Sequence, residues 1–345
     1  MTFRMPAVRP AALSILVTVA ACARPSPPPV FQHEMTTGAV PWTREQVDAA
    51  GDKFSFAVFS DLNGGERPGI FDVAVAQLSL LRPEFILSVG DLIDGGSEDR
   101  AVLEGEWNRF DARAARATAP VIHVGGNHDL TNRTMKDLFA ERYGRVYYHF
   151  IYKNVLFLVL DSEDYTPERM QQIYLARDAA IKVMDGPHPE RAREMEYFRM
   201  PEQVTGEIGT EQSAYFQRVI ADHPEVRWTF LFMHKPVWQR NDEPDFAAIE
   251  SALANRPYTL FNGHFHSYGH TVRNGRDYIT LGTTGGSQSA ADSMAFDHVT
   301  WVTMTGDGPV IGNLRLDGIL DKTGRVPAGG DTLCFQASRC GPTER

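Results

Sequence analysis

Four short polar clusters, each placed directly after an apolar run, constrain this chain more than any other feature. Their letters are GDLID at 90–94, GGNHD at 125–129, MHKP at 233–236 and GHFH at 263–266. Asp61 follows a further apolar run at 54–59. Because the ends of neighbouring strands share one edge of an α/β sheet, side chains that follow several strands gather there. The pattern therefore predicts an α/β fold with one polar site at a sheet edge.

The rest of the pattern fits one catalytic domain that spans residues 51–320. Apolar, β-prone runs predict strands at 54–59, 85–89, 121–124, 155–160, 227–233, 258–261, 278–281, 298–304 and 310–316. Helical spacing of apolar residues predicts helices over 71–81, 98–117 and 210–222. The charged, Met-rich segment 164–201 is interpreted as a helical excursion that overhangs the site.

The side chains in the clusters are carboxylates, an amide and imidazoles, which together suit a pair of metal ions. Two such ions can activate a water molecule and hold both oxygens of a phosphoryl displacement. The sequence therefore predicts a metal-dependent hydrolase of phosphate mono- or diesters that uses a metal-activated hydroxide. Mixed nitrogen and oxygen ligation suits Mn, Fe, Zn, Ni or Co better than Ca or Mg.

The net charge of −10 argues against a nucleic-acid-binding protein, which would show a basic face. It is compatible with a phosphate ester as substrate, because bound metal ions reverse the local field. The oligomeric state, the physiological substrate and the native metals cannot be predicted from the sequence.

From residue 54 to residue 266 the chain resembles the calcineurin-like metallophosphoesterase superfamily. The blocks of that family read D-x-H, G-D-x-x-D, G-N-H-[DE], a lone His after a strand, and G-H-x-H, and four of them are matched in full here. The resemblance implies an α/β fold of the metallophosphoesterase type. This is a β-sandwich flanked by helices, in four layers (αββα).

The resemblance also implies roles for individual residues. Asp91 would bridge the two metal ions, Asp61 and His266 would complete one site, and Asn127, His234 and His264 would complete the other. His128 would lie over the reacting phosphate and stabilise charge or protonate the leaving oxygen. Asp129 resembles the acidic position that orients this imidazole.

Asn63 is the departure from the family pattern, since it stands where the first block normally ends in His. An amide oxygen can bind a metal but is a weaker donor than imidazole to Fe, Zn or Ni. Three outcomes are open: the first site binds its ion loosely, prefers Mn-like ions, or fills only with substrate present. The alternative function is a metal-binding scaffold of the cell envelope with weak or no turnover. His128 and Asp129 favour the enzyme, because a scaffold does not need them.

Arg67 lies in a turn-rich loop directly after Asp61. One hypothesis is that its planar donor fork binds the substrate phosphate. The competing interpretation is an ordinary turn without a functional arginine.

The N-terminus has the pattern of an exported protein. Arg4 and Arg9 precede an apolar run at 11–21 that is too short to span a membrane, so residues 1–22 are interpreted as a signal peptide. The letters VAAC at 19–22 resemble the lipobox of bacterial lipoproteins, which implies lipidation of Cys22. Ordinary secretory cleavage at 21–23 also fits. A Pro-rich spacer and lead-in at 23–50 follow, and we expect a protein of the periplasm or cell envelope, anchored to a membrane by lipid.

The two other cysteines, Cys334 and Cys340, lie in a C-terminal tail at 321–345 that is rich in Gly, Pro and Ser. In an oxidising compartment the pair favours a disulfide over two free thiols.

Overall fold

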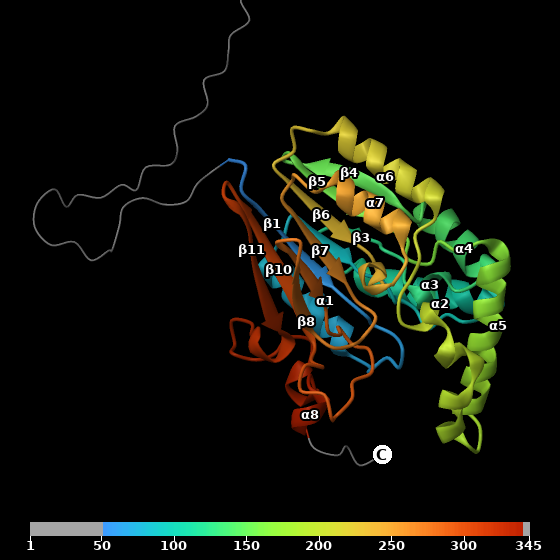
Figure 1. Cartoon of the computed structure of the whole chain (residues 1–345). Helices are drawn as coiled ribbons and strands as arrows, with labels where there is room; N and C mark the ends of the chain where they lie inside the picture. Colours follow the sequence, from blue (N-terminus) through green and yellow to red (C-terminus); the bar gives the residue numbers. More distant parts are fainter. Residues whose placement is uncertain (1–50, 341–345) are drawn as a thin grey trace, which may run out of the picture. The chain divides into compact units, whose positions relative to one another are not determined.

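Two β-sheets lie face to face, with helices on both outer sides (Figure 1). The structure is a computed structural model that describes residues 51–340. The predicted signal peptide, Cys22 and the spacer up to residue 50 lie outside the described residues. Within 51–340, no helix is both long and apolar enough to cross a membrane.

The first sheet has the strand order β11-β10-β1-β2-β3. Its strands are β1 (Phe54–Phe59), β2 (Phe85–Ser88), β3 (Val121–Ile122), β10 (His298–Thr305) and β11 (Gly308–Arg315). The three N-terminal strands run parallel, and β10 and β11 close the sheet in antiparallel fashion. The parallel strands therefore all end at the same edge.

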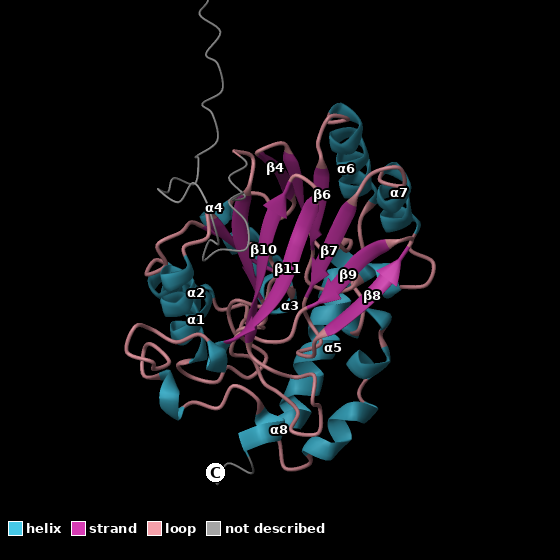
Figure 2. Cartoon of the chain, turned by 90° about the vertical axis from the view of Figure 1, so that its left-hand side faces the viewer, coloured by secondary structure: helices cyan, strands magenta, loops and turns pink. Residues whose placement is uncertain are grey.

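The second sheet has the order β4-β5-β6-β7-β9-β8. It contains β4 (Tyr148–Tyr152), β5 (Val155–Val159), β6 (Trp228–Phe232), β7 (Tyr258–Asn262), β8 (Gly269–Arg273) and β9 (Arg276–Thr280). From β5 to β9 the neighbours pair in parallel, and β4 and β8 are antiparallel edge strands. Figure 2 shows the strands of both sheets from the side of β11.

Alternation along the strands explains the layers, because successive side chains of a strand point to opposite faces. In β1, Phe56 and Val58 face the space between the sheets, whereas Ala57 and Phe59 face the first helical layer. Along β5, Phe157 faces inward, and its neighbours Leu156 and Leu158 pack under the second helical layer. This arrangement confirms the predicted four-layer αββα fold.

The helices divide between the two outer faces. The first sheet is covered by α1 (Ile70–Leu81), α2 (Arg100–Ala114) and α4 (Arg133–Tyr143). The second is covered by α6 (Thr210–Asp222) and α7 (Pro244–Ala252). The sequence patterns did not indicate α4, α7, β4 or β8. The edge strand β8 is mostly exposed and lacks an apolar run, so its sequence carries no strand signal.

Residues 164–203 form a lobe beside the sheets, which we call the overhang. It begins with α5 (Pro167–Met184), for which Thr166 caps the first turn and Pro167 sets the backbone angle. Three 3₁₀ turns follow: η1 (Pro189–Glu194), η2 (Glu196–Arg199) and η3 (Pro201–Gln203). A small apolar cluster of its own, made of Tyr165, Met170, Ile173 and Met200, holds the lobe together.

The C-terminal residues pack onto the domain beyond the predicted end at 320. Val326 and Phe335 are buried in the same cluster as α1 and α2. The elements in this part of the chain are the short turns η5 (Leu316–Gly318) and η6 (Gly330–Thr332) and the helix α8 (Ala337–Cys340). A disulfide joins Cys334 to Cys340, with an S–S distance of 2.07 Å.

Candidate metal centre

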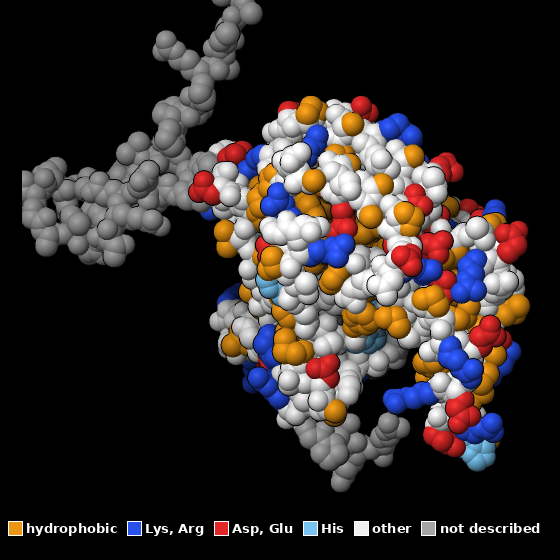
Figure 3. Space-filling model, in the orientation of Figure 1, with side chains coloured by type: hydrophobic (Ala, Val, Ile, Leu, Met, Phe, Trp, Pro, Cys, Tyr) orange, Lys and Arg blue, Asp and Glu red, His pale blue; other side chains and the backbone are white. Residues whose placement is uncertain are grey.

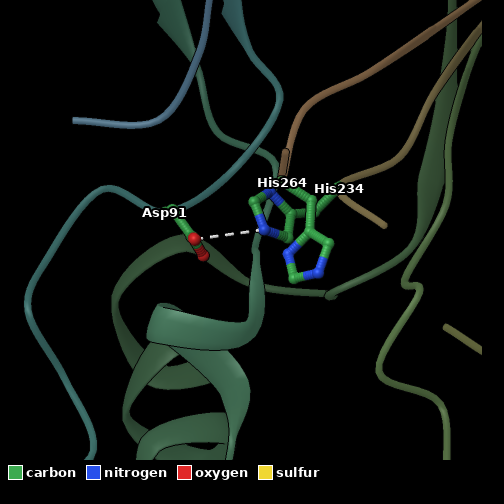
Figure 4. Close-up of side chains that lie close together, drawn as sticks. All are labelled: Asp91, His234 and His264. Carbon is green, nitrogen blue, oxygen red and sulfur yellow. Dashed lines mark ion pairs between the residues drawn. The ribbon is translucent and has the colours of Figure 1, made fainter. Parts of the chain in front are cut away.

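The strand ends bring the predicted ligands together at one edge. Asp61 follows β1, Asp91 follows β2, and His234 follows β6. Both His264 and His266 follow β7, and Asn127 begins the short helix α3 (Asn127–Leu130) after β3. Asp91 belongs to two groups of ligand atoms, one with His234 and His264 and one with Asp61 and His266, each within 4.8 Å. Figure 4 shows the first group.

Each candidate histidine is held by a backbone carbonyl. The distances are 2.8 Å from His234 Nδ1 to Val89 O, 2.9 Å from His264 Nε2 to Gln203 O, and 2.7 Å from His266 Nδ1 to Ser287 O. Because a carbonyl only accepts, the bonded ring nitrogen carries the hydrogen and the other nitrogen of a neutral ring is free as a ligand. The geometry thus selects the tautomer that can bind a metal.

His234 shows that the residues fit a cation. Its Nε2 lies 3.1 Å from Asp91 Oδ2 and 3.1 Å from Asn127 Oδ1, so oxygen atoms surround this nitrogen. Burial alone would lower the pKa of His234, but the nearby Asp91 and Asp61 carboxylates outweigh it and raise the pKa to about 9. The cluster therefore attracts positive charge to the position between these atoms.

Asn63 gives a second, independent sign of a fit. Its side chain is 1% exposed, and Oδ1 has no hydrogen-bond partner in the described structure. A buried carbonyl oxygen without a partner costs about 1–3 kcal/mol. A cation bound within reach of this oxygen would satisfy it, so the unpartnered oxygen is compatible with the metal ions that the sequence predicts.

The backbone at this edge is strained. Asp61, Asp91, His264 and His266 have φ values of 39°, 59°, 79° and 56°, in the left-handed region that non-glycine residues rarely adopt. Within residues 51–340, ten non-glycine residues have a positive φ, and these four are among them. Such strain persists where the surrounding structure imposes it and is typical of functional sites.

Gly126 lets the backbone of the third cluster approach the ligands. A Cβ added there would lie 2.4 Å from Asp91 Oδ1 and 2.7 Å from His234 Cγ. Only glycine leaves room for both side chains at this position.

His128 lies beside this cluster. Its backbone N–H donates to Asp91 Oδ1 over 2.8 Å, and its Nδ1 lies 2.7 Å from the Asp94 carbonyl oxygen. A Cβ added at Gly64 would be 3.2 Å from His266 Nε2 and 3.7 Å from His128 Nε2, so the two rings meet across that glycine. Nε2 of His128 thus lies next to the ligand group.

Asp129 has a different role from the one predicted. Its Oδ2 accepts the N–H groups of Asp91 and Gly126, both at 2.8 Å, and its Oδ1 accepts those of Leu92 at 2.9 Å and Ile93 at 3.2 Å. The carboxylate therefore holds the Asp91 loop. The Asp94 carbonyl orients His128, and the prediction that Asp129 does so is corrected.

Arg67 is bound by the protein itself. Its Nη2 lies 2.7 Å and 2.8 Å from the two oxygens of Asp297, and Nε and Nη1 donate to the carbonyls of Gly286 and Cys334, each at 2.9 Å. In this arrangement the guanidinium ties the loop after β1 to the C-terminal segment. The predicted contact with substrate gains no support from this geometry and stays a prediction.

The sequence patterns did not predict two contacts that the overhang makes with histidines of the site. Arg177 of α5 places Nη2 at 3.3 Å from His128 Nε2, and Gln203 of η3 supplies the carbonyl that holds His264. One signal could have found Arg177, because it falls on the buried face of α5 with Met170, Ile173 and Ala180. Figure 3 shows a hollow between the overhang and the rest of the domain, with a histidine side chain visible at its inner end.

Comparison with known proteins gives three findings. The family model described as calcineurin-like phosphoesterase matches residues 54–268. The mouse serine/threonine-protein phosphatase CPPED1 is 29% identical over 129 residues, which cover 35% of this chain and only 38% of that protein. A dimetal phosphatase from Danio rerio superposes with a TM-score of 0.55 at 17% identity, over 76% of this chain and 96% of the other. This last likeness shows a shared fold.

Proposed function

This chain belongs to the calcineurin-like phosphoesterase family, a family of phosphoric-ester hydrolases, and we propose that it hydrolyses phosphate mono- or diesters with metal ions. The observation that carries the proposal is the position of Asp91 in both ligand groups. A carboxylate with two oxygens can serve two cations at once and offset part of their charge.

The residues proposed to hold the ions form two sets that share Asp91. One set adds Asp61, Asn63 and His266, and the other adds Asn127, His234 and His264. Ions bound there supply Lewis-acid activation of the ester and of a water molecule. The carbonyls of Val89, Gln203 and Ser287 keep the imidazoles oriented for this task.

His128 is proposed as the catalytic acid. With its Nδ1–H donated to the Asp94 carbonyl, the ring presents the Nε2 lone pair on the side of the ligand group, where it accepts from Arg177 Nη2 over 3.3 Å. For His128 to act as the acid, this contact must open and Nε2 must take up a proton, which the imidazolium can then give to the leaving oxygen of the ester.

Export and membrane anchoring are proposed from the sequence alone. The signal peptide and Cys22 support a lipid-anchored protein of the cell envelope or periplasm. Replacing Cys22 by Ser is expected to release the protein from the membrane fraction. Unchanged membrane association of that variant would contradict the anchor.

Asn63 favours a second candidate function, a metal-binding scaffold with weak or no turnover. The deciding experiment strips the purified protein of metal, restores Mn²⁺, Zn²⁺, Co²⁺ or Ni²⁺ singly, and assays chromogenic phosphomonoesters and phosphodiesters. Metal-dependent turnover that disappears in Asp91→Ala supports the hydrolase. Tight metal binding without turnover under any ion supports the scaffold.

The matched control for that assay is Asp137→Asn, which removes an exposed carboxylate from α4 that pairs only with Arg133 in the described structure. Turnover of this variant is expected to equal that of the wild type. A loss of turnover in both Asp91→Ala and Asp137→Asn would indicate an effect of net charge rather than of the metal centre.

A further inference from the structure

Arg177 is a buried cation without a carboxylate partner. Its residue is 7% exposed, and within residues 51–340 its guanidinium donates only to Nε2 of the His128 ring, over 3.3 Å. Arg169, two turns earlier on α5, shows the usual arrangement, since its guanidinium pairs with Glu202 at 2.8 Å. A buried charge lowers the stability of the fold by several kcal/mol when no group of opposite charge lies beside it.

The loop after Asp91 makes room for this side chain. A Cβ added at Gly96, where φ is +68°, would lie 2.5 Å from Arg177 Nη1. The guanidinium therefore packs against the backbone of Gly96, where no side chain is present, and reaches His128. The same histidine donates its backbone N–H to Asp91, so His128 contacts both Arg177 and the shared carboxylate.

A phosphate ester bound at the metal centre would bring a negative charge close to this guanidinium. The guanidinium presents several N–H donors in a plane, which match the oxygens of a phosphoryl group. We propose that Arg177 binds a terminal oxygen of the substrate's phosphoryl group and thereby favours phosphomonoesters over diesters. This inference rests on the proposed phosphoesterase function.

The preference follows from the two kinds of ester. A monoester carries three terminal oxygens and is mostly a dianion at neutral pH, whereas a diester carries two and is a monoanion. An additional cationic contact beside the carboxylate and imidazole cluster therefore acts more strongly on the monoester.

The test uses inorganic phosphate as the probe. Its dissociation constant from the metal-loaded protein is measured by calorimetry for the wild type, Arg177→Met and Arg177→Lys. Loss of charge-assisted hydrogen bonds is expected to weaken phosphate binding by about 10- to 100-fold in Arg177→Met, with partial recovery in Arg177→Lys. The matched control is Lys182→Met, which removes an exposed cation of the same helix that pairs with Asp178. That variant is expected to bind phosphate as the wild type does.

Kinetics supply the second readout. In Arg177→Met, KM for a phosphomonoester is expected to rise more than KM for a diester, so the ratio of monoester to diester kcat/KM falls. Unchanged phosphate affinity, or an equal loss on both esters, overturns the inference and leaves Arg177 as a positioning residue for His128. If Arg177→Met fails to fold, the phosphate affinity and ester ratio of Arg177→Lys decide.

The two proposals fail in different ways. A wild type that binds phosphate through Arg177 but turns over no ester contradicts the phosphoesterase function and leaves the anion site standing. A wild type whose turnover and phosphate affinity do not depend on Arg177 contradicts only the anion site.

Discussion

Two regions of the molecule meet at the candidate site, and they are built in different ways. The edge of strand ends carries the predicted ligands on buried, strained backbone, with every imidazole held by a carbonyl. The overhang consists of one long helix and three 3₁₀ turns around a small apolar cluster. It reaches the site at two points, the Arg177 guanidinium and the Gln203 carbonyl.

This difference in construction indicates that the two regions have different functions. Ligand positions at the strand ends are fixed by the two sheets, so they change only if the core changes. The overhang has an apolar cluster of its own, so its side chains can vary while the backbone carbonyl of Gln203 still holds His264. We therefore expect the strand-end edge to determine the chemistry and the overhang to determine the choice of ester. The following predictions test this division.

The largest effect is expected for Asp129→Ala. Four backbone N–H groups of the strand-end edge would lose their acceptor, and each unsatisfied buried donor costs about 1–3 kcal/mol. We expect the free energy of unfolding to fall by at least about 4 kcal/mol and metal binding to be lost. Denaturant unfolding and metal titration measure both. If Asp129 only oriented His128, metal binding would survive.

Next comes Lys235→Met, at the joint between the two regions. The Lys235 ammonium lies 2.8 Å from Glu163 Oε1 and donates to the Glu202 carbonyl over 2.7 Å, and both carboxylate residues are buried. Removing one partner of a buried pair costs about 3–5 kcal/mol, because the other charge is left alone. Thermal unfolding should show this loss.

The matched change for Lys235→Met is Arg100→Met, which breaks only exposed pairs with Glu104 and Glu141. Its unfolding temperature is expected to stay near that of the wild type. Equal unfolding temperatures of the two variants would mean that the contacts of Lys235 with Glu163 and with the Glu202 carbonyl of the overhang do not stabilise this joint.

A smaller effect is expected for Gly126→Ala. The added methyl group would meet Asp91 Oδ1 and His234 Cγ, so both ligands must shift. Displacement of a metal ligand typically lowers metal affinity or activity by roughly 10- to 100-fold. The same substitution at Gly312, where a Cβ meets nothing within 4 Å, serves as control. Metal affinities that do not differ between the two variants would contradict the close approach.

The smallest effect is expected for Asn63→Ala. The variant removes one amide oxygen from the set around Asp61 and leaves the set around His234 complete. We expect one metal equivalent to bind about tenfold more weakly, with the other unchanged. Metal stoichiometry and stepwise titration resolve the two equivalents. A simultaneous loss of both would show that the two sets act as one.

The strand-end edge could be predicted because its signals are local. An apolar run followed by Asp91 or His234 identifies both the strand and the place where its polar successor lies. The αββα layers follow from the same runs, since alternate residues of β1 and β5 pack on opposite faces. Weakly patterned edge elements such as β8 lack this signal.

The contacts that prediction missed depend on distant partners. His128 and Asp129 are neighbours in α3, and successive residues of a helix point about 100° apart, so adjacency does not bring their side chains together. Arg67 follows Asp61 closely, but its partner Asp297 lies 230 residues further along the chain. Arg177 reaches His128 from a helix whose place beside the sheets is set by tertiary packing.

The bond from Arg67 to the Cys334 carbonyl has a consequence for the order in which the protein is made. The two residues are separated by 267 positions, and contacts of such long range form late in folding because a large loop must close first. During synthesis, Asp61 leaves the ribosome long before the segment that holds its loop. The loop that follows Asp61 can therefore make all of its final hydrogen bonds only after Cys334 has been added.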